Sequence, residues 1–230
     1  TPAAAAAPAP ARAREAYESL TAHESDTLEA IVARLIPSDA NGPGAIEARA
    51  AHYIDRALAG PLSDQVDAYR AGFAAFDRYC RLSRGKPFTE LSPNDQDSVL
   101  IDVESGAATG SGAGFTGNSA AFFNMVKGHT WQGMFGDPYY GGNANFVGWD
   151  LINYPGVRTM MSAADQQKLE KNQLPPNHRS AYDFEGFNKA TARGGSSPES
   201  DPHTHVEMDS HVDPQSAAPQ VQAHGGNDGN

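Results

Sequence analysis

The sequence predicts an all-α domain of five or six helices over residues 20–176, flanked by extended arms. Two observations predict this class. Apolar residues recur at spacings of three and four, and N-cap residues or glycine and proline stops bound each run. A third observation sets one region apart: residues 134–156, MFGDPYYGGNANFVGWDLINYPG, combine glycines, asparagines and aromatic residues. We predict that this region is a long irregular segment and not a helix.

The first two predicted helices are defined by a capping signal and by apolar stripes. Thr21 and Glu24 have the spacing of a capping box, and an apolar stripe follows until Pro37 ends it. A second stripe extends from Ile46 to Leu58 and ends at a Gly-Pro pair. We therefore expect the second helix to begin near Ile46.

The third predicted helix is the clearest, because six residues spaced by four and three share one face: Leu62, Val66, Tyr69, Phe73, Phe76 and Cys80. Ser92, followed by proline, is expected to cap a fourth helix. Glycine-rich residues 106–117 are expected to form a flexible loop. A fifth helix is predicted over residues 119–134, and a short polar sixth near residues 162–172.

The two arms differ from the predicted domain in composition. Residues 1–19 are rich in alanine and proline, which is typical of the neck that remains after an export signal is removed. Residues 177–230 form a polar, low-complexity tail with few large apolar residues, so we expect it to be disordered alone or wrapped on a partner. Cys80, the single cysteine, is expected to be a buried, unreactive thiol.

Charge and hydropathy exclude some partner classes. The formal net charge of -11 argues against nucleic acid and against an anionic membrane surface, since proteins bind both through excess lysine and arginine. No run of apolar residues is long enough to span a bilayer. We therefore expect the chain to be soluble or to be held at a membrane by another component.

Two stretches carry a resemblance to a known family: TLEAIVARLIPSDANGPGAIEARAAHYIDRALAG and FFNMVKGHTWQGMFGDPYYGGNANFVGWDLINYPG. The second is the more specific, because GDPxYGGN is followed at fixed spacing by GW and YPG. The chain resembles the gluconate 2-dehydrogenase subunit 3 family over roughly residues 20–160. One residue departs from the family pattern: Asn153 stands where glycine is expected. Because asparagine tolerates positive φ, the turn is expected to survive.

The resemblance implies a non-catalytic small subunit that holds no cofactor of its own. In that family FAD is bound by a large glucose-methanol-choline-type flavoprotein subunit, and electrons pass through a multihaem cytochrome c subunit to quinone. The small subunit carries a twin-arginine export signal and supports folding and export of its partner. The expected location is therefore the periplasm, at the inner membrane through partner subunits. Gluconate is the substrate that the family name suggests, and related sugars or sugar acids stay open.

Before the resemblance is considered, residues 134–156 fit either a loop packed by its own aromatics or a contact surface. With the resemblance, we predict that this segment docks the flavoprotein subunit. Asp137, followed by proline, is expected to initiate a turn by accepting backbone N–H groups. The predicted interface residues are Phe135, Asp137, Tyr139, Tyr140, Asn143, Phe146, Trp149 and Tyr154.

Two alternatives remain open. The chain could be an independent periplasmic enzyme or metal-binding protein with a site near His129 and Asp137. It could also be an envelope interaction protein without a redox partner. The tail holds a histidine and carboxylate cluster around His203 and His205, but without a scaffold such a cluster is a weak chelator, so no metal site is predicted. No catalytic residue is predicted in this chain.

Overall fold

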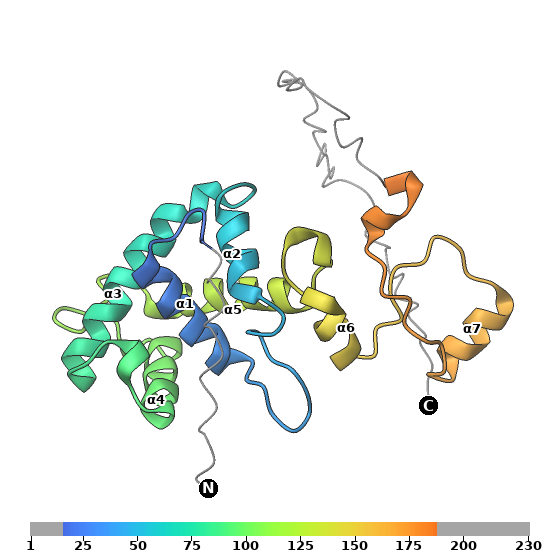
Figure 1. The fold of residues 1–230 in the computed structure, drawn as a ribbon. Helices are drawn as coiled ribbons and strands as arrows, with labels where there is room; N and C mark the ends of the chain where they lie inside the picture. Colours follow the sequence, from blue (N-terminus) through green and yellow to red (C-terminus); the bar gives the residue numbers. More distant parts are fainter. Residues whose placement is uncertain (1–15, 188–230) are drawn as a thin grey trace, which may run out of the picture. The chain divides into compact units, whose positions relative to one another are not determined.

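The computed structural model describes residues 16–187 and confirms an all-α fold (Figure 1). Within these residues there are seven α-helices and six short 3-10 helices, and no β-strand is formed. The last two α-helices are short. The α-helices are α1 (Ala22–Leu35), α2 (Ala50–Leu58), α3 (Val66–Arg84), α4 (Pro93–Glu104), α5 (Ser119–Phe135), α6 (Val147–Leu151) and α7 (Ala163–Glu170).

The predicted capping box opens α1. The Thr21 hydroxyl accepts the Glu24 N–H at 3.3 Å, and the Glu24 carboxylate accepts the Thr21 N–H at 2.9 Å. Two of the unpaired N–H groups at the start of the helix are thereby satisfied. The helix ends at Leu35, two residues before Pro37, as the sequence predicts.

The start of α2 differs from the prediction. The helix begins at Ala50 and not near Ile46, whose side chain is 48% exposed. Arg49 adopts a left-handed conformation with φ 59°, which breaks the helical path between the two. Residues 45–49 instead form turns, so of the predicted stripe only Ile46 lies outside the helix, and the remainder from Ala50 to Leu58 lies on α2.

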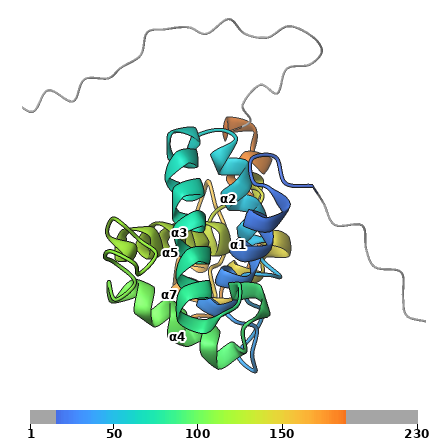
Figure 2. The same cartoon turned by 90° about the vertical axis from the view of Figure 1, so that its left-hand side faces the viewer.

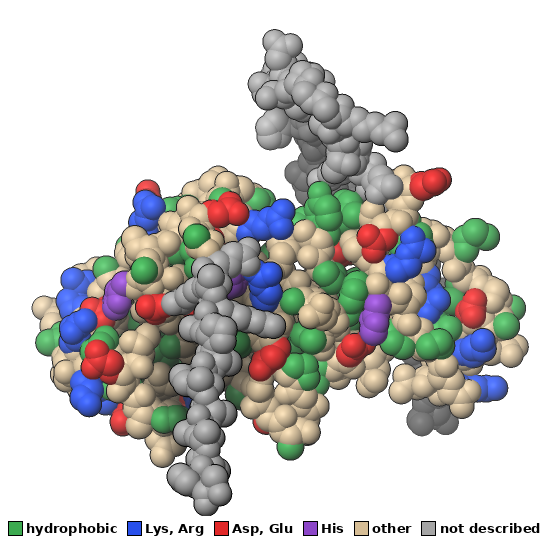
Figure 3. Space-filling view, in the orientation of Figure 1, with side chains coloured by type: hydrophobic (Ala, Val, Ile, Leu, Met, Phe, Trp, Pro, Cys, Tyr) green, Lys and Arg blue, Asp and Glu red, His purple; other side chains and the backbone are tan. Residues whose placement is uncertain are grey.

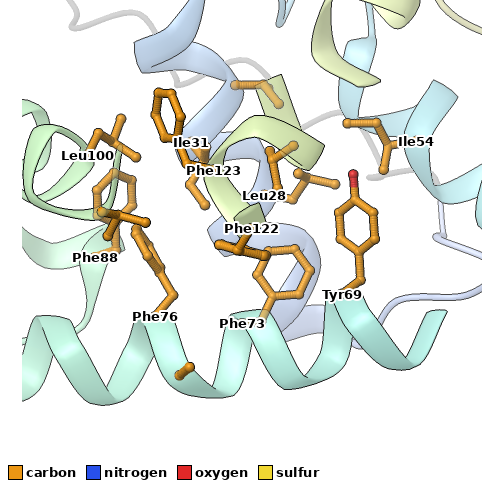
Figure 4. Packing of buried hydrophobic residues seen from close by; sticks show 14 of the residues in the cluster. Leu28, Ile31, Ile54, Tyr69, Phe73, Phe76, Phe88, Leu100, Phe122 and Phe123 are labelled. Atoms are coloured by element: carbon orange, nitrogen blue, oxygen red, sulfur yellow. The ribbon is translucent and has the colours of Figure 1, made fainter. Parts of the chain in front are cut away.

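Helices α3 and α4 follow the predicted signals. Gly85 ends α3 in a left-handed conformation with φ 76°, and the Ser92 side chain caps α4 by accepting the Asp95 N–H at 3.3 Å. In Figure 4, Tyr69, Phe73 and Phe76 project from α3 in the same direction into the core. This face is the one that the sequence predicts, except that α3 begins at Val66, so Leu62 precedes the helix at the start of the 3-10 turn Ser63–Gln65.

Helix α5 is the centre of the domain, since it contacts α1, α2, α3, α4 and α6. In Figure 2, α3 crosses α5. The crossing is close because Gly72 has no side chain: a Cβ there would lie 2.1 Å from the ring of Phe122 on α5. Phe122 in turn packs edge-on against Phe73, with ring centroids 5.7 Å apart.

The glycine-rich residues 106–117 are ordered on the core, in contrast to the flexible loop that we predicted. Ala108 and Phe115 are buried, and the Phe115 ring lies 5.8 Å from Phe122. The Gly110 N–H donates to the Phe115 carbonyl at 2.9 Å, and the Phe115 N–H donates to the Ala108 carbonyl at 3.2 Å. The buried phenylalanine anchors a stretch whose composition alone indicates mobility.

A buried carboxylate fixes the chain that leads into α1. Asp55 on α2 accepts the backbone N–H groups of Glu18, Ser19 and Leu20 at 2.6 to 2.9 Å. Three donors satisfy a carboxylate that would otherwise be costly to bury. Residues 1–15 of the predicted neck and residues 188–230 of the predicted tail lie outside the described residues.

The described helices do not include one that is long and apolar enough to cross a membrane. On the face shown in Figure 3, acidic and basic side chains are interspersed among the described residues. The negative net charge is therefore not gathered into one patch on this face. Shape and aromatic side chains therefore distinguish a docking surface here more than charge does.

Candidate partner interface

Residues 134–156 pack against the end of α5 through glycines that permit close backbone contact. A Cβ at Gly142 would lie 2.2 Å from the Gly133 carbonyl oxygen. A Cβ at Gly148 would lie 1.8 Å from the Met134 carbonyl oxygen. Both contacts exclude any side chain, which explains the glycine content of the segment.

Asn143 holds the segment together from inside. Its side chain is fully buried, and its backbone is left-handed with φ 44°. The amide Nδ2 donates to the Gly136 carbonyl at 2.9 Å, while Oδ1 accepts the Gly148 N–H at 2.8 Å and the Trp149 N–H at 3.4 Å. One side chain thus ties the end of α5 to the start of α6.

The prediction that residues 134–156 contain no helix is wrong, and the hydrogen bonds of Asn143 explain why. It contains the 3-10 turns Pro138–Tyr140 and Ala144–Phe146 and the short helix α6. The Oδ1 of Asn143 serves the first N–H groups of α6, as an N-cap does, although Asn143 is not adjacent to the helix in sequence. Asn153 has φ 54°, so the predicted positive-φ turn at this position is confirmed.

The indole of Trp149 faces inward. Its Nε1 donates to the Phe135 carbonyl at 2.9 Å, and its side chain is buried. The rings of Phe146 and Tyr154 pack on it with centroids 5.5 and 4.8 Å away. Trp149 is therefore the centre of a small aromatic core within the segment.

Asp137 connects the segment to residues much later in the chain. Its Oδ1 accepts the Tyr139 N–H at 2.9 Å, which confirms the predicted turn. The same oxygen accepts the Ser180 hydroxyl at 2.6 Å, and Oδ2 accepts the Ala181 N–H at 2.8 Å. Three donors therefore converge on one carboxylate at the edge of the segment.

Tyr139 and Tyr140 form the exposed side of the segment, with 42% and 44% of their surface accessible. Their rings meet edge-on at 5.3 Å, and Tyr182 stacks on Tyr139 at 3.9 Å. The hydroxyl of Tyr140 is hydrogen bonded to that of Tyr182, and this bond, together with burial, raises the pKa of Tyr140 to about 12. Tyr140 is therefore a neutral phenol at physiological pH.

A hollow of about 430 Å³ lies between these tyrosines and the end of α2. Its lining is mainly apolar and aromatic. Tyr53 stands on the α2 side, where its hydroxyl donates to Gln132 at 3.0 Å and partial burial raises its pKa. The lining residues are Glu18, Tyr53, Arg56, Ala57, Ala59, Gly60, Pro61, Tyr139 and Tyr140.

A family model described as gluconate 2-dehydrogenase subunit 3 matches residues 22–156, which is more than half of the chain. The chain belongs to the gluconate 2-dehydrogenase subunit 3 family. The matched range ends at Gly156, so it includes the whole glycine and aromatic segment. Searches of curated proteins and of solved structures found no match to this chain.

Within this family member, the eight predicted interface residues fall into three groups by exposure. Tyr139, Tyr140 and Tyr154 are exposed. Phe135, Asp137 and Phe146 are half-buried. Asn143 and Trp149 are buried and hold the segment in shape. The structure thus separates residues that can meet a partner directly from residues that fix the surface.

Four residues without a sequence signal complete this surface. Tyr53 was assigned to the apolar stripe of the second helix, and Arg56 was not considered, yet both line the hollow. Ser180 and Tyr182 were assigned to the tail. A serine followed by tyrosine in a polar stretch gives no sequence signal for a contact with residues 137–140.

The residues of the alternative enzyme or metal site have separate partners. His129 is buried and hydrogen bonded to the Tyr69 hydroxyl at 2.8 Å, and burial lowers its pKa. Asp137 is engaged by Ser180 and Ala181.

Among residues 16–187, no group of three histidine, cysteine or acidic side chains is placed to hold a metal ion. His203 and His205 lie outside the described residues. Cys80 is buried, and burial raises its pKa to about 12.

Proposed function

We propose that this chain is the non-catalytic small subunit of an FAD-dependent dehydrogenase complex that oxidises gluconate or a related sugar acid. Membership of the family makes the chain a subunit of a larger assembly. The observation that carries the proposal is the rigid tyrosine surface, built within the matched range and held by buried Asn143 and Trp149.

The hollow between Tyr53 and Tyr139 is the proposed docking site for the large flavoprotein subunit. Interface energetics are dominated by a few aromatic and arginine side chains around desolvated pockets. Tyr53, Tyr140 and Arg56 are of these types and line one hollow. Because Asn143 fixes the segment before binding, little conformational entropy is lost when the partner docks.

The other parts of the proposal follow from the family. FAD belongs to the flavoprotein subunit, and haem c belongs to a multihaem cytochrome c subunit that passes electrons to quinone. The small subunit stabilises the flavoprotein and supports its folding and twin-arginine export to the periplasm. The complex associates with the inner membrane through its other subunits.

Copurification tests the docking site directly. Tyr53→Ala changes the hollow on α2 and Tyr140→Ala changes it on the segment, and each is expected to weaken binding of the flavoprotein subunit by about 2 kcal/mol, or roughly 30-fold. Leu82→Ala and Ile101→Ala are the controls, because both side chains are 62% exposed and lie on α3 and α4. Folding of each variant is checked by circular dichroism. Equal recovery of flavoprotein by folded tyrosine variants and by controls would contradict the assignment.

A further inference from the structure

Residues 177–184, which we call the latch, lie against the family segment although they follow the matched range. The Ser180 hydroxyl and the Ala181 N–H both donate to the Asp137 carboxylate, at 2.6 and 2.8 Å. Tyr182 stacks on Tyr139 with ring centroids 3.9 Å apart. Its hydroxyl is also hydrogen bonded to Tyr140. The latch therefore contacts both exposed tyrosines of the proposed docking site.

The beginning of the latch contacts the other end of the segment. The His178 ring stacks on Phe146 at 5.1 Å, and its Nε2 lies 2.6 Å from the Asp150 carboxylate. The Asn177 N–H donates to the Pro155 carbonyl at 3.2 Å. The latch thus extends over the segment from Pro155 to Asp137.

Little burial holds the latch in place. Between residues 157 and 186, Ser180 is the single buried residue, and α7 has none. Figure 1 shows the chain leaving α6, forming α7 and turning back. Hydrogen bonds and ion pairs near solvent contribute little to stability, and segments with few buried contacts open locally before the whole protein unfolds.

The surface beneath the latch is, by contrast, fixed by buried contacts. Asn143 and Gly148 are buried and would keep their hydrogen bond if the latch left. Opening would free the stacked face of Tyr139 and the hydroxyl of Tyr140, and it would remove two of the three hydrogen bonds that the Asp137 carboxylate accepts. These groups adjoin the hollow, since both tyrosines also line it.

We propose that the latch is a displaceable cover and that the flavoprotein subunit competes with it for Asp137, Tyr139 and Tyr140. This inference rests on the proposed function and adds a regulated step to it. The flavoprotein would replace the latch with its own hydroxyl or N–H donors on Asp137 and its own apolar group on Tyr139. The apparent dissociation constant is then the intrinsic constant divided by the fraction of open chains.

Binding of purified flavoprotein subunit to latch variants tests the competition. The double variant Ser180→Ala, Tyr182→Ala removes latch contacts without changing the surface beneath. Because it favours the open state, it is expected to bind about tenfold more tightly than the unaltered chain. Leu169→Ala on α7 is the matched control, since this side chain is 43% exposed and lies outside the latch.

The same titration separates failure of this inference from failure of the proposed function. If the unaltered chain binds, Tyr53→Ala weakens binding, and the latch variant binds equally or less tightly, docking stands and the competition is refuted. If flavoprotein binds neither the unaltered chain nor the latch variant, the proposed function is refuted and the competition with it.

Hydrogen exchange in the full chain gives an independent measure of latch opening. The backbone N–H groups of Asn177 and Ala181 are hydrogen bonded across to the segment, so their exchange reports whether the latch is closed. They are expected to exchange faster than the N–H groups of α3, and faster still when the flavoprotein subunit is added. Protection equal to that of α3 in the lone chain, or increased protection on docking, would overturn the proposal.

Discussion

Replacement of Asn143 by alanine tests whether one buried amide holds the family segment in shape. The change removes the acceptor of the Gly148 N–H, which is buried, at a cost of about 1–3 kcal/mol. It also removes the donor to the Gly136 carbonyl, which is partly exposed, so water limits that cost to less than about 1 kcal/mol. Alanine at φ 44° adds about 1 kcal/mol of backbone strain.

The sum for Asn143→Ala is about 4 kcal/mol, which corresponds to a decrease in Tm of about 8–16 °C for a domain of this size. Asn145 is the matched control, because it is also left-handed, with φ 54°, but its side chain is exposed. Asn145→Ala therefore adds mainly the backbone strain of alanine at positive φ, and its Tm should fall by no more than about 4 °C.

Glycine variants at the same two positions separate the hydrogen bonds from the backbone term. Glycine adopts positive φ without strain, so Asn145→Gly should leave the free energy of unfolding almost unchanged. Asn143→Gly should still lower it by about 2–3 kcal/mol, because the hydrogen bonds of the side chain are lost. The measurement is thermal unfolding followed by circular dichroism. Equal Tm values for the Asn143 and Asn145 variants would refute the argument that the Asn143 side chain holds the segment.

Three further predictions concern other parts of the domain. Gly148→Ala places a Cβ against the Met134 carbonyl oxygen and should lower Tm, whereas Gly128→Ala, whose added Cβ would meet nothing within 4 Å beyond the adjacent backbone of α5, should raise stability by about 0.5–1 kcal/mol. Because burial raises the pKa of Cys80 to about 12, its thiol should react with a disulfide reagent at about pH 8 only after unfolding. Burial lowers the pKa of His129, so its contribution to stability is present above the ordinary histidine pKa and is lost as the pH falls through the folded value. The urea midpoint should therefore fall more between about pH 7 and pH 5 in the unaltered chain than in His129→Gln.

The sequence predicted those helices whose ends are set by local chemistry. The capping box at Thr21 and the serine cap at Ser92 act within three residues, so both starts could be read from the chain. The start of α2 could not be predicted in this way, because nothing in the residue type of Arg49 indicates a left-handed conformation. Helix α6 was missed for a related reason, since its N–H groups are served by Asn143, four residues before it begins.

The composition of the segment predicted a contact surface, but it could not say which aromatic residues face outward. Trp149 and Tyr139 are equally suited to an interface by type. The two side chains differ in exposure because Gly148 approaches the Met134 backbone, so that Trp149 faces inward and donates to the Phe135 carbonyl. The latch could not be predicted from the sequence for another reason: Ser180 lies 43 positions after Asp137, and no local periodicity records such a contact.

The contrast between segment and latch explains how one domain can combine a rigid docking surface with control of access. The buried hydrogen bonds of Asn143 and Trp149 keep the segment in place, so little ordering cost is added when a partner arrives. The latch covers the same surface with contacts that are mostly near solvent, and its closure lowers apparent affinity only by the free energy of closing. A partner that replaces the donors on Asp137 recovers that energy, whereas an apolar surface without such donors leaves a carboxylate unsatisfied. Asp137 would therefore favour a partner that has hydroxyl or N–H donors over an apolar surface that has none. Asp137→Asn should reduce this difference in binding affinity more than it reduces the free energy of unfolding of the chain.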